Sequence, residues 1–587
     1  MEQILENLSE KLKNANEHEK RNKEYSSIST DEERVKFTMG LIHEHNVQLL
    51  MKFEEKSASQ SVLYRNEGNK LFTSHNLSLN KTIEMYTKSI AFAPISSKEL
   101  SIAYANRSAA LFTARLYNAC LLDIGRALTL NYEQRLRVKL YARRVKCLIM
   151  LKKKSDTEVD KAIEEARMWL DKMDMNNPKR SVIEETLTNP EKIVTIETEF
   201  VKWEEEKYCP NIHDKNQEII GASSAVELRY SDEFGKHILA TRDIKPGEVL
   251  ALEECYTSVL IPEKFYTNCS YCLTQTWSLI PCDACVTVLY CNDECKNAAW
   301  EEFHDIECKV IGSLVGVGMN NLGLMSLRLA VKALKEAKSF NNLKLLIDLA
   351  DNAKDPRTNG FTDGKLDDTK YISVYTLARN TEKRSIPDLF GRSLNAVYIV
   401  YMLATRSKMF GKVLNNNLEN LVNNQFVTFI GGLIMRHQQI IPSNVHSIAE
   451  ENKIPTDPNE RAAALMPFYS LFNHTCDPPV TRVSFGRKMA LYAVYPIKKG
   501  EQIFDNYGMH YALHPKNYRL SRLYQQFRFV CNCRSCIEDW PTFPNVPSFW
   551  VQRLANVNNE KLNYAMVKFS KSTTSWRSEL KLKIIPK

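Results

Sequence analysis

The feature that most constrains this chain is a run of seven cysteines and one histidine between residues 269 and 308. Cysteines separated by two or three residues can direct both sulfurs at one metal ion, and tetrahedral Zn²⁺ takes four thiolate or imidazole ligands. Eight candidate ligands therefore predict two zinc ions, each with a closed coordination shell that supports the fold and leaves no open position for catalysis. The candidate ligands are Cys269, Cys272, Cys282, Cys285, Cys291, Cys295, His304 and Cys308.

A second, smaller group of cysteines lies further along the chain, at Cys531, Cys533 and Cys536. Three ligands do not complete a tetrahedral zinc site, so a fourth must come from elsewhere. Cys476, in the stretch Asn473-His474-Thr475-Cys476, is the best candidate, and it predicts a third zinc ion that ties two distant segments together. The alternative is three surface thiols. The remaining cysteines, which we expect to be ordinary small apolar residues, are Cys120, Cys147, Cys209 and Cys255.

Length and composition bound the class of protein. The 587 residues leave room for three or four domains, and 44% hydrophobic with 25% charged residues is typical of folded chains. No apolar run reaches the ~20 residues that span a bilayer, and Glu2, Glu6 and Glu10 replace the basic end and apolar core of a signal peptide, so we expect neither membrane insertion nor secretion. The net charge of +9 is too dilute to predict direct nucleic-acid binding. The expected location is the cytoplasm, with the nucleus left open.

The first 59 residues are charged and helical in pattern. Apolar Ile4, Leu8 and Leu12 recur at four-residue spacing, which places them on one face of a helix. This pattern predicts a helical arm at 1–59 that either acts as a lid or packs on a core.

Residues 60–200 contain an internal repeat. The stretch 64–72 aligns with 104–112 at a shift of 40 residues, and the stretch 141–148 follows at a shift of 37. Helical hairpins with small residues at the centre of the first helix resemble tetratricopeptide repeats. Three such hairpins would stack into a short solenoid with a concave binding face.

Strand-like sequence lies on both sides of the cysteine series. Residues 226–230 and 249–252 alternate or are rich in β-formers around a Lys-Pro-Gly-Glu turn, and the pattern returns at 482–485 and 490–495. The stretch 309–445 has mostly helical periodicity. The sequence therefore predicts a sheet that is interrupted by inserts.

The order of these motifs resembles a known family. Asn473-His474-Thr475-Cys476, followed by Gly-Glu-Gln-Ile-Phe-Asp-Asn-Tyr-Gly at 500–508 and then by Cys-x-Cys-x2-Cys, resembles a SET domain with its post-SET cysteines. The block at 269–308 resembles a MYND zinc finger. With the helical repeats, the chain resembles the SET- and MYND-domain protein-lysine methyltransferases, in their tetratricopeptide-bearing branch. The interleaved MYND pairing would give Cys269, Cys272, Cys291 and Cys295 to one ion and Cys282, Cys285, His304 and Cys308 to the other.

The resemblance implies a multidomain α+β chain, in which a β-rich SET core is split by the MYND zinc finger and a helical insert. The implied parts are the N-terminal helical arm at 1–59, an α-helical tetratricopeptide array at 60–200, the first part of the SET core at 221–265, the MYND finger at 266–308, the helical SET insert at 309–445, the second part of the SET core at 446–508, a zinc-bound post-SET segment at 509–540 and a short tail at 541–587.

The resemblance also implies a reaction and its site. The expected activity is transfer of a methyl group from S-adenosylmethionine to a lysine side chain of a protein substrate. Tyr507 is the expected catalytic residue, with its hydroxyl directed at the transferring methyl. The cofactor-binding residues that the resemblance implies are Phe234, Gly235, Lys236, Asn380, Asn444, Asn473, His474, Tyr507 and Phe529.

Three features depart from the family pattern. His237 stands where many SET domains carry a second glycine, Phe527 replaces a second active-site tyrosine of several relatives, and only about fifty residues follow Cys536, where relatives carry a long helical domain. The alternative function is therefore a catalytically weak or inactive adaptor that scaffolds chaperones or transcriptional regulators, with proline-rich peptides as candidate ligands of the MYND finger. A RING-type ubiquitin ligase fits less well, because a RING needs its histidine in the middle of the series.

Five polar residues on the predicted repeats could form a peptide-binding site. Residues four apart share a helix face, and basic and Asn residues at such positions resemble the clamp with which tetratricopeptide domains grip the C-terminal carboxylates of heat-shock chaperones. The alternative is a solvated basic stripe. The residues are Arg65, Asn69, Asn106, Lys139 and Arg143.

Overall fold

The computed structural model describes residues 1–75, 78–130, 132–151, 156–190, 209–449 and 460–542. The chain divides into two compact units. The sheet unit comprises Met1–Leu50, Glu205–Ile261 and Val317–Lys587, and the helical unit comprises Met51–Glu204 and Pro262–Gly316. Residues 191–200 of the predicted repeats and most of the tail predicted at 541–587 lie outside the described residues.

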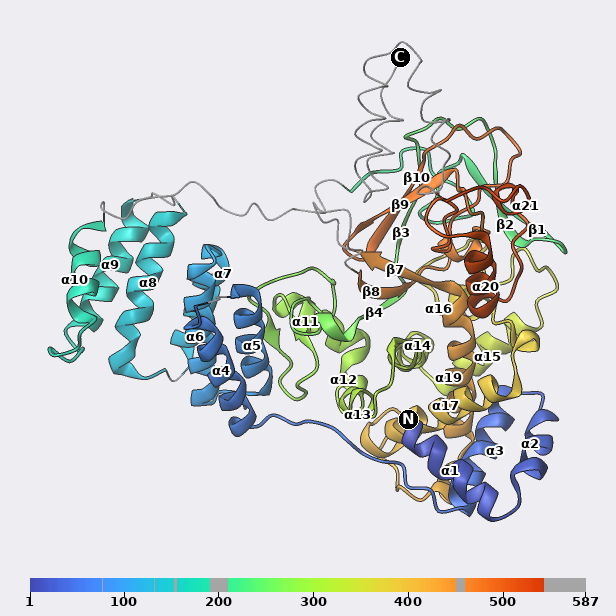
Figure 1. Cartoon of the computed structure of the whole chain (residues 1–587), viewed down its shortest axis with the longest axis horizontal. Coiled ribbons are helices and arrows are strands. Elements are labelled where there is room, and N and C mark those ends of the chain that lie inside the picture. Colours follow the sequence, from blue (N-terminus) through green and yellow to red (C-terminus); the bar gives the residue numbers. More distant parts are fainter. Residues whose placement is uncertain (76–77, 131, 152–155, 191–208, 450–459, 543–587) are drawn as a thin grey trace, which may run out of the picture. The chain divides into compact units, whose positions relative to one another are not determined.

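Helices that follow one another along the chain also pack against one another in the helical unit (Figure 1). At Gly68 a Cβ would come within 2.6 Å of the Tyr86 ring, which explains a glycine in the interior of a helix. The Tyr86 hydroxyl donates a hydrogen bond to Asn69 Oδ1 at 2.9 Å. The helices are α4 Ala58–Phe72, α5 Leu79–Phe92, α6 Lys98–Thr113, α7 Tyr117–Thr129, α8 Arg137–Met150, α9 Asp156–Leu170 and α10 Arg180–Thr188.

The cysteine-rich segment belongs to the same unit as these helices. Its secondary structure is short, as expected where side chains that could hold metal take the place of an extended core. Trp277 packs against the buried core of α5, α6 and α7. The elements are β5 Ile280–Pro281, β6 Leu289–Tyr290, α11 Asp293–Ala299, the π-helical turn Trp300–His304, α12 Asp305–Glu307 and α13 Ile311–Gly316.

A buried ion pair fixes the cysteine-rich segment to the helices. The side chains of Arg107 and Asp123 are 0% exposed and make two hydrogen bonds, at 2.7 and 2.9 Å. Arg107 also donates to the Leu279 carbonyl at 2.8 Å, and Arg126 donates to the Ser278 carbonyl at 2.6 Å. Two arginines on the helices therefore hold the strand-like start of the cysteine-rich segment by its backbone.

Asp123→Ala is expected to destabilise the helical unit by about 3–5 kcal/mol, because it leaves the Arg107 guanidinium buried without its carboxylate. Chemical denaturation of the full zinc-loaded chain, followed by circular dichroism, measures the loss. Glu184→Ala is the control, because it removes a surface ion pair between Glu184, whose side chain is 47% exposed, and Arg180. We expect this substitution to change the free energy of unfolding by no more than about 0.5 kcal/mol. Equal midpoints for the two variants would contradict a stabilising role of the buried pair.

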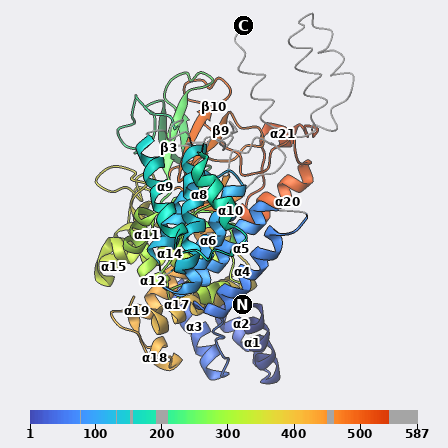
Figure 2. The same cartoon turned by 90° about the vertical axis from the view of Figure 1, so that its left-hand side faces the viewer.

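The sheet unit contains antiparallel strands in three small sheets. β1 (Val226–Ser231) pairs with β2 (Gly235–Ala240), a second sheet has the order β3-β10-β9, and a third has the order β4-β8-β7. Strands β3, β9 and β10 lie together in both views (Figure 1 and Figure 2). The other strands are β3 Val249–Glu254, β4 Thr257–Leu260, β7 Val445–Ala449, β8 Glu460–Leu465, β9 Val480–Phe485 and β10 Lys488–Ala493.

The two turns predicted at Lys-Gly or Pro-Gly sequences have the conformation that requires glycine. Gly247 and Gly500 have φ angles of 91° and 82°. Each turn precedes a strand or bridge of the sheets, and Ile244 and Ile497 pair beside them. The β-rich parts predicted from the sequence are thus present, with the last strand ending at Ala493.

Helices α14 to α19 form the helical part of the sheet unit, and the N-terminal helices pack on them. α3 lies so close to α19 that a Cβ at Gly432 would come within 2.8 Å of Glu32 Cα, and one at Gly431 within 2.7 Å of a Val35 methyl. The N-terminal arm therefore packs on a core. The helices are α1 Glu2–Asn14, α2 His18–Ser26, α3 Asp31–Glu44, α14 Asn321–Ala337, α15 Phe340–Asp351, α16 Tyr371–Tyr375, α17 Ile386–Arg406, α18 Leu418–Val422, α19 Gln425–Asn444, α20 Lys516–Phe527 and α21 Arg534–Ile537.

Within the described ranges, none of the helices combines the length and the apolar character needed to cross a membrane.

Candidate functional site

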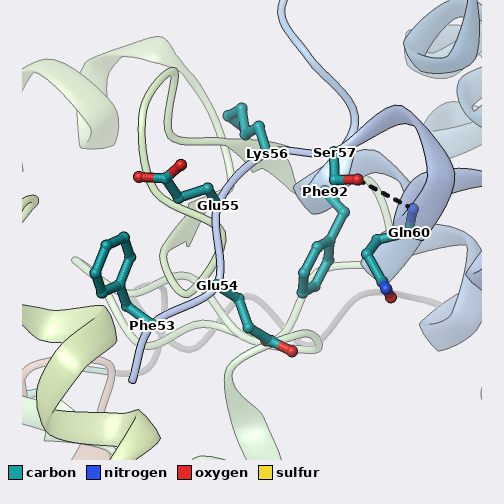
Figure 3. A pocket seen from close by; sticks show the side chains of 7 residues that line it. All are labelled: Phe53, Glu54, Glu55, Lys56, Ser57, Gln60 and Phe92. Atoms are coloured by element: carbon teal, nitrogen blue, oxygen red, sulfur yellow. Dashed lines mark hydrogen bonds between the residues drawn. The ribbon is translucent and has the colours of Figure 1, made fainter. Parts of the chain in front are cut away.

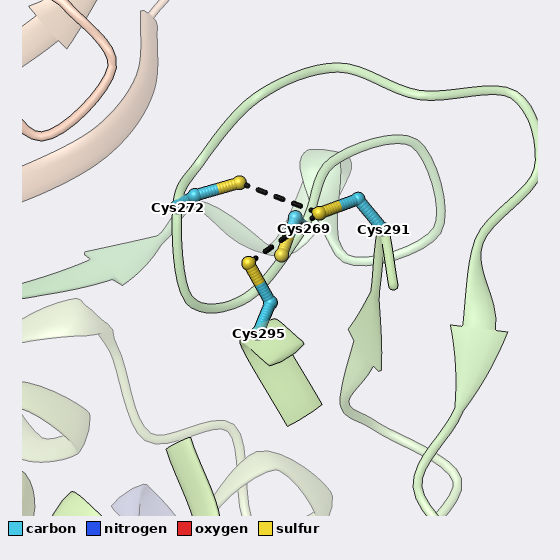
Figure 4. Close-up of side chains that lie close together, drawn as sticks. All are labelled: Cys269, Cys272, Cys291 and Cys295. Atoms are coloured by element: carbon cyan, nitrogen blue, oxygen red, sulfur yellow. Dashed lines mark hydrogen bonds between the residues drawn. The ribbon is translucent and has the colours of Figure 1, made fainter. Parts of the chain in front are cut away.

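Twelve cysteine and histidine side chains meet in three groups of four, and in each group the ligand atoms lie within 4.8 Å of one another. Figure 4 shows the first group converging from two loops and the start of α11. Sulfurs bound to one tetrahedral zinc at ~2.3 Å lie about 3.8 Å apart. The spacing fits such an ion in every group. The groups are Cys269, Cys272, Cys291 and Cys295; Cys282, Cys285, His304 and Cys308; and Cys476, Cys531, Cys533 and Cys536.

Individual distances agree with this arrangement. In the first group the Cys272 and Cys291 sulfurs are 3.7 Å apart. In the second, His304 Nε2 lies 3.3 Å from the Cys282 sulfur. In the third, the sulfurs of Cys476 and Cys536 are 3.5 Å apart although 60 residues separate them in the sequence. All three donor sets are those expected for structural zinc.

The segment that carries Cys476 lies beside the segment that carries Tyr507. The Asp505 amide donates to the Asn473 carbonyl at 2.8 Å, and the Thr475 amide donates to the Asp505 carbonyl at 2.9 Å. Asn506 Nδ2 adds a third hydrogen bond, to the Thr475 carbonyl at 2.9 Å. Two motifs that are about thirty residues apart in sequence are therefore held in one fixed pairing.

His474 is oriented by this pairing. Its Nδ1 accepts a hydrogen bond from the Tyr507 amide at 3.1 Å, so Nδ1 carries no proton and the ring hydrogen is on Nε2. Nε2 lies 3.4 Å from the Cys476 sulfur, where an N–H stabilises a thiolate. Burial lowers the pKa of His474 to about 4, so the ring is neutral at physiological pH.

Tyr507 lies in an aromatic setting with its hydroxyl fixed. The hydroxyl donates to the Phe472 carbonyl at 2.7 Å. The Tyr507 ring centroid is 5.1 Å from that of His474, 4.6 Å from that of Phe527 and 6.3 Å from that of Phe529. Burial raises the pKa of Tyr507 above its ordinary value, so the hydroxyl stays protonated and acts as a hydrogen-bond donor.

The turn between β1 and β2 approaches this pairing through its backbone. Asn473 Nδ2 donates to the Phe234 carbonyl at 3.1 Å. Gly235 has a φ of 62°, a conformation that other residues rarely adopt. His237 lies outside that region of φ, so the histidine that replaces a family glycine costs no backbone strain. Its Nδ1 instead folds back to the Gly235 carbonyl at 2.9 Å.

Lys236 points in a different direction from the residues around it in the sequence. Its ammonium donates to the Asn359 carbonyl, in the loop after α15, and burial lowers the pKa of Lys236 to about 8. Lys236 therefore contributes to holding that loop against β2. If it also contacts a cofactor, it does so through its backbone.

Asn380 and Asn444 lie together at the end of α19. Asn444 Nδ2 donates to the carbonyls of Ala378 and Ile440, at 2.8 and 2.7 Å, and Asn380 Nδ2 donates to Ser443 Oγ at 3.2 Å. Their amide nitrogens are therefore engaged within the protein. The structure places these two residues beside each other and gives them no direct contact with Tyr507.

One buried acid that supports the site has no counterpart among the residues predicted from the sequence. Glu253, at the end of β3, is 0% exposed, and its carboxylate accepts hydrogen bonds from the amides of Phe468 and Tyr469, both at 2.8 Å. Burial raises its pKa well above the ordinary value. These amides begin the turn that leads to Asn473. No sequence signal distinguishes Glu253 from its exposed neighbour Glu254.

The five residues of the predicted peptide clamp are only partly brought together. Asn106 Nδ2 donates to Asn69 Oδ1 at 2.9 Å. Arg143 is turned inward, to Ser108 Oγ at 2.6 Å. Burial, with Lys179 and Arg143 nearby, lowers the pKa of Lys139. One guanidinium nitrogen of Arg65 is buried without a hydrogen-bond partner among the described residues.

A separate pocket of about 400 Å³ lies in the helical unit, where the chain enters α4 (Figure 3). The Lys56 ammonium donates to the Ala91 carbonyl at 2.8 Å. No residue of the predicted catalytic, cofactor, metal or clamp sets lines it. The lining residues are Phe53, Glu54, Glu55, Lys56, Ser57, Gln60 and Phe92.

Known proteins match this chain in the same region. The SET domain family model matches residues 235–508, from the β1–β2 turn to the residue after Tyr507. The protein-lysine N-methyltransferase SMYD4 of Pongo abelii is 27% identical over 557 residues, covering 82% of this chain and 67% of that protein. SMYD4 of Mus musculus is 27% identical over 564 residues with the same coverage, and SMYD4 of Gallus gallus is 28% identical over 523 residues, covering 77% and 69%.

One solved structure, the SET domain of LSMT bound to lysine and AdoHcy, matches 53% of this chain and 54% of that chain at 13% identity. Its TM-score is 0.23. The family match, the SMYD4 relatives and the paired motifs at 473–476 and 505–507 agree with one another. Residues 235–508 are a SET domain, and over most of its length the chain is similar to the SMYD4 protein-lysine N-methyltransferases.

Proposed function

We propose that the sheet unit transfers a methyl group from S-adenosylmethionine to the ε-amine of a lysine in a protein substrate, with Tyr507 at the transferring methyl. The observation that carries the proposal is the fixed pairing of 473–476 with 505–507, which orients His474 and Tyr507 toward each other through the 3.1 Å hydrogen bond. The SMYD4 relatives, which are named as protein-lysine N-methyltransferases, support the reaction class.

The face next to this pairing fits a cofactor with an ammonium and a flat ring system. Within the described residues, Asn473 Oδ1 accepts no hydrogen bond, and the side chain lies at the surface, so it can accept one from an amino group. Phe234 is 44% exposed, and a Cβ at Gly235 would meet nothing within 4 Å. This open backbone beside an exposed aromatic ring supports placing the methionine part of the cofactor against Phe234, Gly235 and Asn473.

The remaining cofactor contacts follow the family pattern. We assign to His474 the role of orienting the segment that carries Tyr507, and we place Phe529 in the aromatic wall beside Tyr507. Asn380 and Asn444 would line the part of the cofactor site that lies away from Tyr507. Lys236 would contribute its backbone only, since its side chain is committed to Asn359. The side-chain Oδ1 atoms of both asparagines are the groups left to accept from a ligand, because their Nδ2 atoms are engaged.

S-adenosylmethionine supplies an electrophilic methyl on a sulfonium, and the new N–C bond forms as the C–S bond breaks. The lysine amine must lose its proton to solvent first, because an ammonium has no lone pair. Aromatic surroundings such as Phe527 and Phe529 disfavour the charged amine and lower its pKa. The Tyr507 hydroxyl, held by the Phe472 carbonyl, positions the amine for in-line attack.

Phe527 leaves this site with one tyrosine hydroxyl near the amine. Its ring packs directly on Tyr507, at 4.6 Å between centroids. A phenylalanine here makes no hydrogen bond to the amine and leaves more room beside it. We infer that the enzyme accepts amines that already carry a methyl group.

The metal content that we propose is three zinc ions, two in a MYND finger at 269–308 and one bridging Cys476 to the post-SET cysteines. The three groups of four ligands support this number. Each ion has four good donors and would be structural.

Isothermal calorimetry of S-adenosylmethionine with the full zinc-loaded chain tests the proposal. We expect binding at micromolar concentrations, and about tenfold weaker binding for Asn473→Ala, since one oriented hydrogen bond to a charged group is worth about 1.5–3 kcal/mol. Asn342→Ala is the matched control, because Asn342 lies at the exposed start of α15. Asn506→Ala is less suitable, because the Asn506 side chain donates a hydrogen bond to the Thr475 carbonyl. Absence of heat and of any thermal shift would favour the adaptor function.

An additional adaptor function is favoured by the helical unit. Its helices and the cysteine-rich segment share the buried Arg107–Asp123 contact, so they can present one rigid binding surface. We propose that the helices are tetratricopeptide repeats that bind the C-terminal peptide of a chaperone, and that the MYND finger takes proline-rich peptides. The Asn69–Asn106 contact and the half-buried Lys139 support a carboxylate site there.

A fluorescent peptide ending in Met-Glu-Glu-Val-Asp should bind the full chain in the micromolar range. Lys139→Ala should weaken binding about tenfold, because a charge-assisted hydrogen bond is lost. Lys81→Ala, on the exposed side of α5, should leave it unchanged. Fluorescence anisotropy measures both. If neither Lys139→Ala nor amidation of the peptide's C-terminus weakens binding, the five residues are ordinary surface.

A further inference from the structure

Arg482, in the middle of β9, contacts three different segments with its guanidinium. Nε lies 3.2 Å from Asp505 Oδ2, one Nη donates to the Asn506 carbonyl at 3.1 Å, and the other donates to His446 Nδ1 at 2.8 Å. The side chain is 26% exposed, so these contacts are mostly removed from water. Two of the three contacts fall on the residues directly before Tyr507.

Asp505 needs this arginine. Its side chain is 4% exposed, and burial raises its pKa while the charge of Arg482 opposes that shift. A buried carboxylate without a cation carries a large desolvation cost. The backbone of Asp505 also makes both hydrogen bonds that pair this segment with Asn473 and Thr475. Arg482 therefore stabilises the residue through which the two motifs are joined.

The third contact of Arg482 extends toward Asn444. Because arginine only donates, His446 Nδ1 is an acceptor, and its ring hydrogen on Nε2 is directed to Ser470 Oγ at 3.2 Å. Ser470 Oγ itself donates to the Met466 carbonyl at 2.8 Å and lies 3.2 Å from the Asn444 carbonyl. Arg482 therefore also holds β7, the strand that begins directly after Asn444. The same guanidinium contacts the segment before Tyr507 on one side and β7 on the other.

We propose that Arg482 is a positioning residue for methyl transfer, which acts by fixing the backbone of Asp505 and Asn506 so that the Tyr507 hydroxyl keeps its place. It touches neither methyl donor nor amine. The inference rests on the proposed function in assigning Tyr507 to the reaction, but the position of Tyr507 can be measured independently of activity. A displacement of about 1 Å at a reacting group can cost about 100-fold in rate.

The shape of the guanidinium distinguishes positioning from mere charge compensation. A lysine at 482 would keep the positive charge near Asp505, but one ammonium cannot reach Asp505, Asn506 and His446 together in the planar geometry of an arginine. Arg482→Lys should therefore fold and bind S-adenosylmethionine while losing rate. A purely structural ion pair predicts that rate falls only as far as folded protein and cofactor affinity fall.

The kinetic test uses tritiated S-adenosylmethionine with core histones and total cell protein as acceptors. For Arg482→Lys we expect kcat to fall about 10-fold and for Arg482→Ala about 100-fold, with the Kd of S-adenosylmethionine within about threefold. Arg242→Ala is the matched control, because it removes a surface arginine paired with Glu248 in the same unit and should leave kcat unchanged. An unchanged kcat in Arg482→Ala would overturn the proposal. A fall in kcat no larger than the losses of cofactor affinity and of folded protein, followed by the melting temperature, would overturn it too.

A second readout does not depend on turnover. With 3-fluorotyrosine incorporated at position 507 alone, the fluorine NMR signal should shift or broaden in Arg482→Lys and in Arg482→Ala but not in Arg242→Ala. An unmoved signal in both Arg482 variants would overturn the proposal even if the chain transfers no methyl group to these acceptors. A moved signal without methyl transfer by the unmutated chain would support the positioning role and count against the proposed reaction.

Discussion

Tyr507→Phe is expected to reduce methyl transfer by at least about 100-fold while the affinity for S-adenosylmethionine stays within a few-fold. The substitution removes only the hydroxyl, whose hydrogen bond to the Phe472 carbonyl fixes its direction. Loss of one oriented polar group that acts in the transition state costs about 10²–10³ in rate. The measurement is the initial rate of tritium transfer at saturating cofactor, together with calorimetric titration of each protein.

Tyr511→Phe is the matched control for this change. Tyr511 lies beyond the paired motifs and contacts the Trp540 ring at 5.0 Å and the His510 ring at 4.9 Å. We expect removal of the Tyr511 hydroxyl to change the rate of methyl transfer by less than about twofold. If Tyr507→Phe turned over as fast as the unmutated chain, another residue would have to orient the amine.

Cys476→Ala is expected to lower the zinc content from three ions to two and to abolish methyl transfer. Cys476 is 0% exposed and lies two residues after His474, so the third ion would tie the post-SET segment to the cofactor side. Removing one of four ligands leaves three thiolates that bind zinc far more weakly. The metal content is measured by mass spectrometry and the activity by tritium transfer.

Cys255→Ala is the control for a buried cysteine outside the three ligand groups. Cys255 is 2% exposed and directly follows β3, so the substitution should cost stability without removing zinc. Two equivalents of zinc in the unmutated chain would contradict the bridging site. Three equivalents in Cys476→Ala would show that the post-SET cysteines hold their ion with another ligand.

The sequence was most informative where function fixes both residue type and spacing. Ligand spacing predicted the eight-ligand block at 269–308 and the post-SET cysteines, and turn sequences predicted Gly247 and Gly500, because these signals are local. The division of the block into two groups followed from the resemblance to the MYND finger. The pairing of 473–476 with 505–507 followed from family motifs. The SET domain and the similarity to SMYD4 methyltransferases that these motifs predict are confirmed by the family match and the SMYD4 relatives.

The supporting residues could not be predicted, because their importance depends on partners far away in sequence. Glu253 accepts from amides more than two hundred residues later, and nothing in its own neighbourhood marks it as buried. The sequence around Arg482 indicates an outward-facing residue of a strand. In the structure its guanidinium contacts Asp505 and His446. Burial and long-range hydrogen bonds decide these roles, and the hydrophobic periodicity of the sequence does not predict such hydrogen bonds.

Side-chain direction was the other limit. Lys236 was expected at the cofactor from its place in the motif, yet its ammonium is held by the Asn359 carbonyl. Arg143 was expected on the groove with Lys139, yet it donates inward to Ser108 and Ala105. Residues four apart share a helix face, but a long side chain can fold toward the core when buried acceptors are within reach.

The most direct test of the account is to identify the product. The full zinc-loaded chain is incubated with tritiated S-adenosylmethionine and total cell protein, the protein is hydrolysed, and the amino acids are separated. The account predicts radioactivity in N-methylated lysine for the unmutated chain and about 100-fold less for Tyr507→Phe. Label in another amino acid, or equal label in N-methylated lysine from both proteins, would contradict it.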